Sequence, residues 1–255
     1  MLMPDENGNI LVYILNPAEE TISVLEIPKN TSVEVSRGLG KYPLGSVWQL
    51  GINEHLEGKL VAETVTTALH IPVFSWADIQ GRDLVETNLI GILKAVFYPF
   101  KTNVHFTDKI RIAILSVSIG TNKRRLINLA DTSYLKSVDL ESGREFVVGS
   151  VFPQEIKSLV VDDIFSRNTV KVDINDNSGV YGVSDKLGGV VESVGAKVVS
   201  VNKGVAAKTD CVISGKAKTS VGYLSLLLDC KQQEKMSQSV YDIEITIGEQ
   251  FAERF

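Results

Sequence analysis

Residues 170–204 read VKVDINDNSGVYGVSDKLGGVVESVGAKVVSVNKG, and this stretch decides the fold. A strand leads into the polar turn 175–179, and a helix follows it. The helix has apolar residues at spacings that place them on one face: Val183, Leu187, Val190, Val191 and Val194. Glycine commonly follows the last residue of a helix, so Gly195 is expected to end this one. Residues 197–201 then begin a second strand.

The remaining C-terminal residues predict a strand, a helix and a final strand. Residues 210–213 form the short strand, and the next helix has apolar residues at Val221, Leu224, Leu227 and Leu228. Segment 241–247 alternates strictly between apolar and polar residues, which is the period of a half-buried strand. The whole order matches a βαββαβ domain of the split βαβ, ferredoxin-like type. We expect helices on one face of its sheet and solvent on the other.

Two glycines, Gly188 and Gly189, lie inside the first of these helices. Each costs a helix up to about 1 kcal/mol relative to alanine. We interpret them as a sign of tight packing between helix and sheet, in preference to close approach of a ligand.

The N-terminal half predicts a mixed sheet flanked by helices. Its strands are expected at residues 9–15, 21–27, 73–79, 124–129 and 144–148. Its helices are expected at residues 58–70, 84–97, 108–119 and 153–165. The connection 166–168 follows the last helix, so we predict two α/β domains, residues 1–166 and 168–255.

Composition excludes several classes of function. A net charge of −5 argues against nucleic-acid binding, which needs a basic surface stripe, and we interpret the basic residues 123–125 as a solvated turn. No apolar run approaches the ~20 residues that cross a bilayer, and no leader begins the chain. We therefore expect contact with a membrane only through an anchor that this chain lacks. The three histidines are too far apart in sequence for a metal motif, so we expect no metal site and no catalytic residues.

Both halves resemble the LytR-CpsA-Psr family of bacterial cell-envelope proteins. The stretch 170–204 is similar to that family's C-terminal domain. LVYILNPAEETISVLEIPKNTSVEV, residues 11–35, and ETVTTALHIPVFSWADI, residues 63–79, are similar to its catalytic domain. In the family this domain transfers glycopolymers from a polyprenyl diphosphate to peptidoglycan, with arginines on the diphosphate, an acidic residue and Mg²⁺. The resemblance also implies a location outside the membrane.

The motif that carries the family's chemistry is altered in this chain. The family's Pro-Arg-Asp is here Pro28-Lys29-Asn30, and its later arginine cluster has no counterpart in the sequence. Lysine lacks the planar guanidinium group with which arginine binds phosphate through two hydrogen bonds, and asparagine supplies no ionised oxygen. We therefore expect a degraded catalytic domain, in which Lys29, Asn30, Arg37 and Lys41 are the candidate ligand-binding residues.

Three functions remain open. The first is a non-catalytic envelope protein that binds a glycopolymer or an envelope protein, with a polyprenyl phosphate lipid as a further candidate ligand. The second is a Mg²⁺-dependent phosphotransferase in which Lys29, Arg37 and Lys41 replace the lost arginines. The third is an intracellular scaffold that keeps only the fold. No cofactor is expected, apart from Mg²⁺ in the second case.

The two cysteines, Cys211 and Cys230, flank the last long helix. A helix of about ten residues is ~15 Å long and can return its end to the start of the preceding strand. The two side chains would then be close enough for a disulfide, which an exported protein would form. Two buried thiols that never pair are the alternative.

Overall fold

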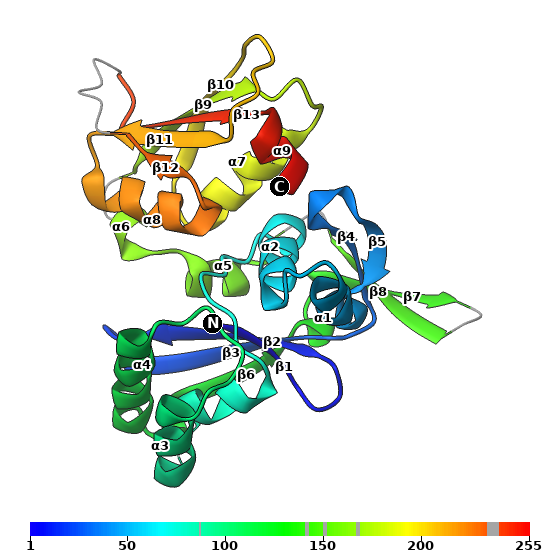
Figure 1. The fold of residues 1–255 in the computed structure, drawn as a ribbon, viewed down its shortest axis with the longest axis vertical. Coiled ribbons are helices and arrows are strands. Elements are labelled where there is room, and N and C mark those ends of the chain that lie inside the picture. The colour runs from blue at the N-terminus through cyan, green and yellow to red at the C-terminus, as the bar shows by residue number, and fades with distance from the viewer. Residues whose placement is uncertain (87, 141–142, 150–151, 167–168, 234–239) are drawn as a thin grey trace. The chain divides into compact units, whose positions relative to one another are not determined.

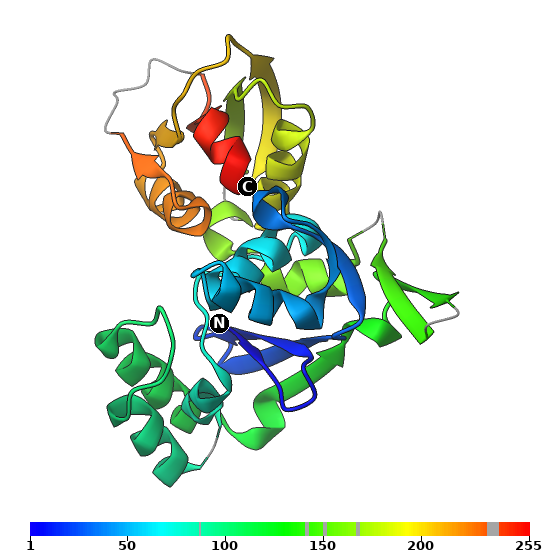
Figure 2. The same ribbon diagram turned by 45° about the vertical axis from the view of Figure 1, so that its right-hand side comes forward.

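The structure is a computed structural model that describes residues 1–86, 88–140, 143–149, 152–166, 169–233 and 240–255. It shows a mixed α/β protein, as the sequence predicts. The chain forms two compact units, which Figures 1 and 2 show from two directions. The first contains residues 1–35, 41–64 and 75–154, and the second contains residues 36–40, 65–74 and 155–255. The predicted boundary 166–168 includes residues 167 and 168, which lie outside the described residues.

The first unit is built on a sheet with the strand order β1-β2-β3-β6. The strands are β1 (Leu2–Pro4), β2 (Ile10–Asn16), β3 (Thr21–Ile27) and β6 (Arg124–Asn128). β2 and β3 correspond to the strands predicted at residues 9–15 and 21–27 and pair antiparallel, and β6 runs parallel to β3. Side chains alternate between the two faces. Both faces of this sheet are buried. Leu11 and Ile22 are buried on one face, and Ile10 and Leu25 are buried on the other.

The helices of this region begin with α1 (Leu44–Asn53) and α2 (Gly58–Leu69), and α2 contributes residues to both units. The 3₁₀ helix η2 (Ile79–Val85) follows, and then come α3 (Leu89–Phe97) and α4 (Phe106–Ser118). Shorter 3₁₀ turns are η1 (Ser36–Gly38), η3 (Thr121–Lys123) and η4 (Leu129–Asp131).

Two predictions for this region are wrong. Residues 73–79 form no strand and make only isolated bridges at Trp76 and Ala77. The helix predicted over 84–97 is divided into two elements, because η2 occupies its start and α3 begins anew after Asn88. The side chain of Asn88 caps α3 by accepting a hydrogen bond from the Ile90 amide at 3.1 Å. A side-chain cap divides the predicted helix here, and the spacing of apolar residues does not reveal such a cap.

A second sheet of four strands has the order β5-β4-β8-β7. Its strands are β4 (Thr31–Val35), β5 (Gly40–Pro43), β7 (Leu135–Leu140) and β8 (Gly143–Val148). β7 and β8 are antiparallel, and β4 pairs with β8 in parallel. Since β3 ends at Ile27 and β4 begins at Thr31, the residues 28–30 carry the chain from the first sheet into the second.

The second unit contains α5 (Gln154–Val160) apart from its first residue, and α6 (Asp163–Ser166), where the sequence predicts one helix over 153–165. The break is explained by Asp162, whose carboxylate accepts a hydrogen bond from the Ile164 amide at 2.9 Å and so begins α6. The five-stranded sheet that follows has the order β10-β9-β13-β11-β12. Its strands are β9 (Lys171–Asn177), β10 (Lys197–Lys203), β11 (Cys211–Gly215), β12 (Lys231–Gln232) and β13 (Ile243–Gly248).

The six predicted elements of the βαββαβ order are present, with the short strand β12 added before the last strand, but the pairing of strands differs from the split βαβ type. In a split βαβ arrangement another strand separates the two strands that a helix joins. Here β9 and β10 are direct parallel neighbours joined by α7 (Val183–Ser193), and β11 and β12 are direct parallel neighbours joined by α8 (Lys218–Leu228). β13 lies between the two pairs, parallel to β9 and antiparallel to β11. The short helix α9 (Glu249–Arg254) ends the chain.

One face of this sheet is apolar and the other polar, as the alternation predicts. Val172, Ile174 and Ile245 lie in a buried cluster with the apolar residues of α7 and α8. On the opposite face the Asn175 amide donates hydrogen bonds to the carboxylates of Asp173 and Glu244 at 3.3 and 3.0 Å.

Gly189 permits a close contact inside the second unit. A Cβ atom at Gly189 would lie 2.7 Å from Nε2 of His70, whereas a Cβ atom at Gly188 would meet only a methyl group of Val198 at 4.0 Å. The tight packing that the sequence predicts therefore exists at Gly189, but its partner is the His70 ring and not the sheet. Burial lowers the pKa of His70, so the ring is held neutral.

We expect the substitutions Gly189→Ala and Gly188→Ala to have opposite effects. Gly189→Ala should lower the free energy of unfolding by about 1–3 kcal/mol, because the new methyl group overlaps the His70 ring. Gly188→Ala should be neutral or should raise it by up to about 1 kcal/mol, since alanine favours the helix. Urea unfolding measures both. Equal effects of the two changes, or no relief of Gly189→Ala by His70→Ala, would contradict this account.

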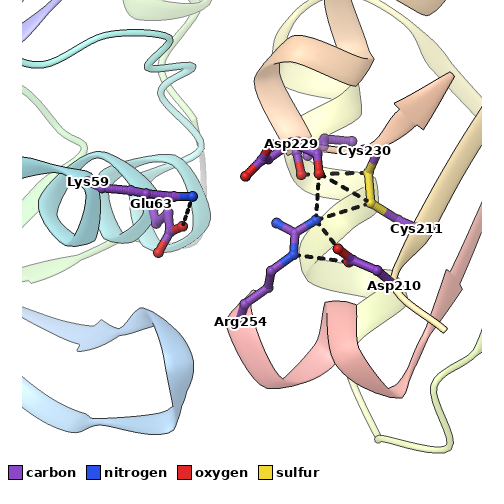
Figure 3. A network of polar contacts seen from close by, with 8 residues as sticks. Lys59, Glu63, Asp210, Cys211, Asp229, Cys230 and Arg254 are labelled. Atoms are coloured by element: carbon purple, nitrogen blue, oxygen red, sulfur yellow. Dashed lines mark hydrogen bonds and ion pairs between the residues drawn. A yellow bond between two sulfur atoms is a disulfide. The ribbon is translucent and has the colours of Figure 1, made fainter. Parts of the chain in front are cut away.

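The predicted disulfide between Cys211 and Cys230 is present. It joins β11 to the residue just before β12, and thereby holds β12 beside β11. Figure 3 shows the Arg254 side chain at this disulfide. Its guanidinium group donates hydrogen bonds to the Asp210 carboxylate and to the Asp229 carbonyl oxygen, both at 3.0 Å, and lies 3.1 Å from the Cys211 sulfur. Asp229 has a left-handed φ of 53° and ends α8.

Replacing both cysteines by serine should lower the free energy of unfolding by about 3 kcal/mol, because the disulfide closes a loop over a sequence separation of 19 residues. Urea unfolding of oxidised protein measures the loss, and reduced wild-type protein serves as the control and should match the double variant. Two free thiols, counted under denaturing conditions in protein from an oxidising compartment, would show that the bond does not form in solution.

Candidate functional site

The connection between β3 and β4 contains the motif Pro28-Lys29-Asn30 that the sequence singled out. The Asn30 side-chain amide donates a hydrogen bond to the Arg144 carbonyl oxygen, and the Asn30 carbonyl oxygen accepts one from the Phe146 amide at 3.1 Å. Both partners lie on β8. Asn30 therefore joins the connection to the strand that pairs with β4, which is a structural task.

The main chain of Lys29 is also held on both sides. Its amide donates a hydrogen bond to the Asn9 side-chain oxygen at 3.1 Å, and its carbonyl oxygen accepts one from the Gly45 amide at 2.8 Å. A Cβ atom at Gly45 would lie 2.6 Å from the Cβ atom of Lys29, so glycine is required for this approach. The Lys29 side chain itself is exposed.

Carboxylates lie near this connection, but they do not form a magnesium site. Asn9 donates its side-chain amide to Glu26 at 2.8 Å and to Asp5 at 3.1 Å, and the other oxygen of Asp5 accepts the Asn7 and Asn9 amides. These oxygens face N–H donors, whereas Mg²⁺ requires oxygen ligands in an octahedral shell. No group of three or more His, Cys, Asp or Glu residues could hold a metal within the part of the chain that the structure describes. The residues present therefore do not fit the ion that the family resemblance implies.

The other two candidate residues lie on separate elements. Lys41 is exposed on β5 in the first unit. Arg37 lies in η1, with a left-handed φ of 69°, and belongs to the second unit. The structure thus gives Lys29 and Asn30 a shared loop but does not give the four residues a shared element.

A cluster that the sequence did not predict surrounds Tyr13 on β2. Arg124 donates hydrogen bonds to the carbonyl oxygens of Val85 and of Ser116, the latter at 2.7 Å, and the Arg82 guanidinium forms an ion pair with Glu86 at 2.7 Å. Burial raises the pKa of Tyr13, while the positive charges of Arg82 and Arg124 act in the opposite direction.

The interpretation of residues 123–125 as a solvated turn is therefore wrong for Arg124, which begins β6 and is half-buried. Its Nε atom is buried without a hydrogen-bond partner among the described residues. Nothing in the sequence could have revealed this cluster, because Tyr13, Arg82 and Arg124 meet only through the pairing of strands and the path of η2. Arg124 is bonded to two main-chain oxygens, and the Nε atom of Arg82 is paired with Glu86.

The sequence matches no protein-family model and no curated protein. Several solved structures are similar to this chain. TagT from B. subtilis is 15% identical, with 58% of this chain and 83% of TagT covered and a TM-score of 0.41. A structure of the LytR-CPS2A-psr family protein YwtF (TagT) with bound octaprenyl pyrophosphate lipid is 14% identical, covering 58% and 82%, with a TM-score of 0.41. A transcriptional regulator from Enterococcus faecalis is 13% identical, covering 77% and 86%, with a TM-score of 0.43.

Proteins of the LytR-CPS2A-Psr family are thus among the structural neighbours of this chain, and the resemblance seen in the sequence is confirmed to that extent. Identities and TM-scores of this size do not carry an argument about activity. The function is therefore argued from the contacts of this chain's own residues.

Restoring the family's acidic residue should damage the structure at Asn30. Asn30→Asp replaces an N–H donor by a carboxylate that faces the Arg144 carbonyl oxygen, and should lower the free energy of unfolding by about 1 kcal/mol at neutral pH. The pKa of the new carboxylate should be raised, so stability should return as the pH falls and the group becomes a donor.

Urea unfolding at neutral and at acidic pH measures this effect, with Lys29→Ala as a control on an exposed side chain. Full stability of Asn30→Asp at neutral pH would show that the hydrogen bond to β8 is dispensable.

Proposed function

We propose that this protein is a non-catalytic cell-envelope protein of the LytR-CpsA-Psr type, which binds a glycopolymer or an envelope protein outside the membrane. The observation that carries this proposal is the hydrogen bonding of Asn30. At the position where the family has its acidic residue, the side chain is neutral and bonded to β8. A group with this structural task supplies neither a base nor an ionised ligand for a metal.

The charges of the first unit also argue against phosphotransfer. Stabilising the transfer of a phosphoryl group depends almost entirely on positioned cations. Of the cationic groups described above, Arg82 is paired with Glu86 and Arg124 with two carbonyl oxygens. Lys29 retains an exposed ammonium group. Such a group can attract an anionic polymer, but it cannot bind a diphosphate through the two parallel hydrogen bonds that a guanidinium group makes.

The disulfide supports a location outside the cytoplasm, because such bonds form and persist in oxidising compartments. It also argues against the intracellular scaffold. No helix among the described residues is long and apolar enough to span a membrane.

The bound ligands of the structural neighbours suggest what to test. One neighbour is TagT bound to LIIa-WTA, and another family protein holds octaprenyl pyrophosphate lipid. We infer that an anionic glycopolymer of the cell wall is the first ligand to try for this chain, with the exposed Lys29 side chain as one contact.

We expect purified protein to show no release or transfer of product from a polyprenyl diphosphate that carries a glycopolymer, in the presence of Mg²⁺. Radiolabelled product measures turnover. In parallel, the protein should sediment with cell-wall sacculi that carry anionic glycopolymer, and Lys29→Ala should weaken this binding. Gly188→Ala, an exchange in the second unit, serves as the control.

Turnover by the wild type above that of Lys29→Ala would overturn the non-catalytic assignment and favour the phosphotransferase. Equal sedimentation with sacculi stripped of glycopolymer would overturn the choice of glycopolymer and favour a protein partner.

A further inference from the structure

Helices α3 and α4 of the first unit are apolar on two sides. Their inner sides are buried and pack with the sheet: Ile92, Ala95 and Val96 from α3 lie in one cluster with Ala113 from α4 and with Met3, Leu11 and Ile22 of the strands. Lys94 is the only charged residue in α3. A helix that is apolar all round is normally covered all round, and the inner packing covers only one side of α3.

The outer sides form a patch that we name the α3/α4 apolar face. Its members are Leu89, Ile90, Leu93, Phe97 and Tyr98 from α3 and the residue after it, and Phe106, Ile110, Ile114 and Val117 from α4. These nine are among 21 large apolar side chains that are exposed in the described residues, so the exposure is concentrated here. Ile90 is 68% exposed, Phe97 70% and Ile114 66%.

The two rows of this face belong to one surface. The rings of Phe97 and Phe106 lie with their centroids 6.2 Å apart, at the point where α3 leads toward α4. Figures 1 and 2 both show α3 and α4 side by side. Soluble proteins rarely expose an apolar surface of two helices, and one that is exposed marks a site of interaction.

The two helices that carry this face contain more basic than acidic residues, but acidic residues of neighbouring elements offset several of them. The Asp83 carboxylate, for example, lies against Gly91 of α3. Residues 88–118 contain Lys94, Lys101, Lys109 and Arg111 but only one acidic residue, Asp108, which gives a local net charge of +3 in a chain of net charge −5. Arg111 bonds Asp108 at 3.2 Å and Lys101 bonds Glu57 at 2.7 Å, while Lys109 is buried over the Phe100 ring. Lys94 is exposed beside Leu93 on α3.

We propose that the α3/α4 apolar face docks on the surface of a bilayer that contains anionic lipids. Helices that lie on membranes combine leucine, isoleucine and phenylalanine on one side with lysine and arginine beside them, so that side chains enter the acyl boundary while cations meet the headgroups. Tyr98, Phe97 and Phe106 supply aromatic side chains of the kind that gather at the membrane–water interface. This docking needs no membrane-spanning segment and does not depend on the proposed function.

A second copy of the chain is a poorer occupant. In a two-fold symmetric dimer the same face meets itself, so the exposed Lys94 side chains of both copies would enter one interface. Like charges brought together in this way oppose association. An anionic lipid surface has the sign that complements the exposed Lys94.

Flotation of the purified full chain with vesicles tests the proposal. One set of vesicles contains phosphatidylcholine with phosphatidylglycerol, and the other contains phosphatidylcholine alone. We expect the protein to float with the anionic vesicles and to be partly released by salt. The double variant Leu93→Ser/Ile114→Ser should bind them at least about tenfold more weakly, because two apolar side chains no longer enter the bilayer. Lys94→Gln should weaken binding to the anionic vesicles about fivefold.

The matched control is Val205→Ser/Leu226→Ser, which makes the same kind of change at two side chains of the second unit that are 89% and 71% exposed. Thermal unfolding checks that each variant is folded. No flotation of the wild type, or equal loss in the two double variants, would overturn the proposal. Sedimentation showing a dimer that only Leu93→Ser/Ile114→Ser dissociates would overturn it in favour of a second copy, and equal binding to both kinds of vesicle would overturn the anionic preference.

Discussion

The first unit depends on one constraint: residues 28–30 must lead from a strand of one sheet directly into a strand of another. Three residues leave little freedom, and hydrogen bonds hold each end of the connection. The Lys29 amide is bonded to Asn9 beside the first sheet, and Asn30 is bonded through its side chain and its main chain to β8 in the second. The residues that the family would use for chemistry are here the residues that join two sheets.

This constraint explains why a change of residue type alters the function expected of the loop. A carboxylate at this position could serve a metal or a proton, but it could not donate to the Arg144 carbonyl oxygen. The amide of Asn30 can donate, and the hydrogen bond satisfies a main-chain acceptor next to β8. The same exchange that removes charge from the site therefore adds a contact to the fold, so the proposed loss of catalysis is compatible with retention of structure at this residue.

The sequence predicted the types of most elements because apolar spacing reflects burial. It located the β2–β3 pair, α7, α8 and the alternating strand β13, each of which has a regular pattern. It did not predict which strands are neighbours. The alternation of Ile243, Ile245 and Ile247 shows which face of β13 is buried, but not which strands pair with its two edges. It also missed the breaks at Asn88 and Asp162, where one side chain caps a new helix within an apolar pattern.

The site was less predictable than the fold for the same physical reason. Lys29 and Asn30 could be found because they are adjacent in a recognisable motif, but their hydrogen bonds to Asn9 and Arg144 join residues far apart in the chain. The Tyr13 cluster and the α3/α4 apolar face differ in what the sequence shows. The cluster has no sequence signal, whereas the face does, since α3 has apolar residues on all sides and only one lysine. We infer that a helix with more apolar surface than its own unit covers has a partner, and the exposed Lys94 indicates the sign of that partner's charge.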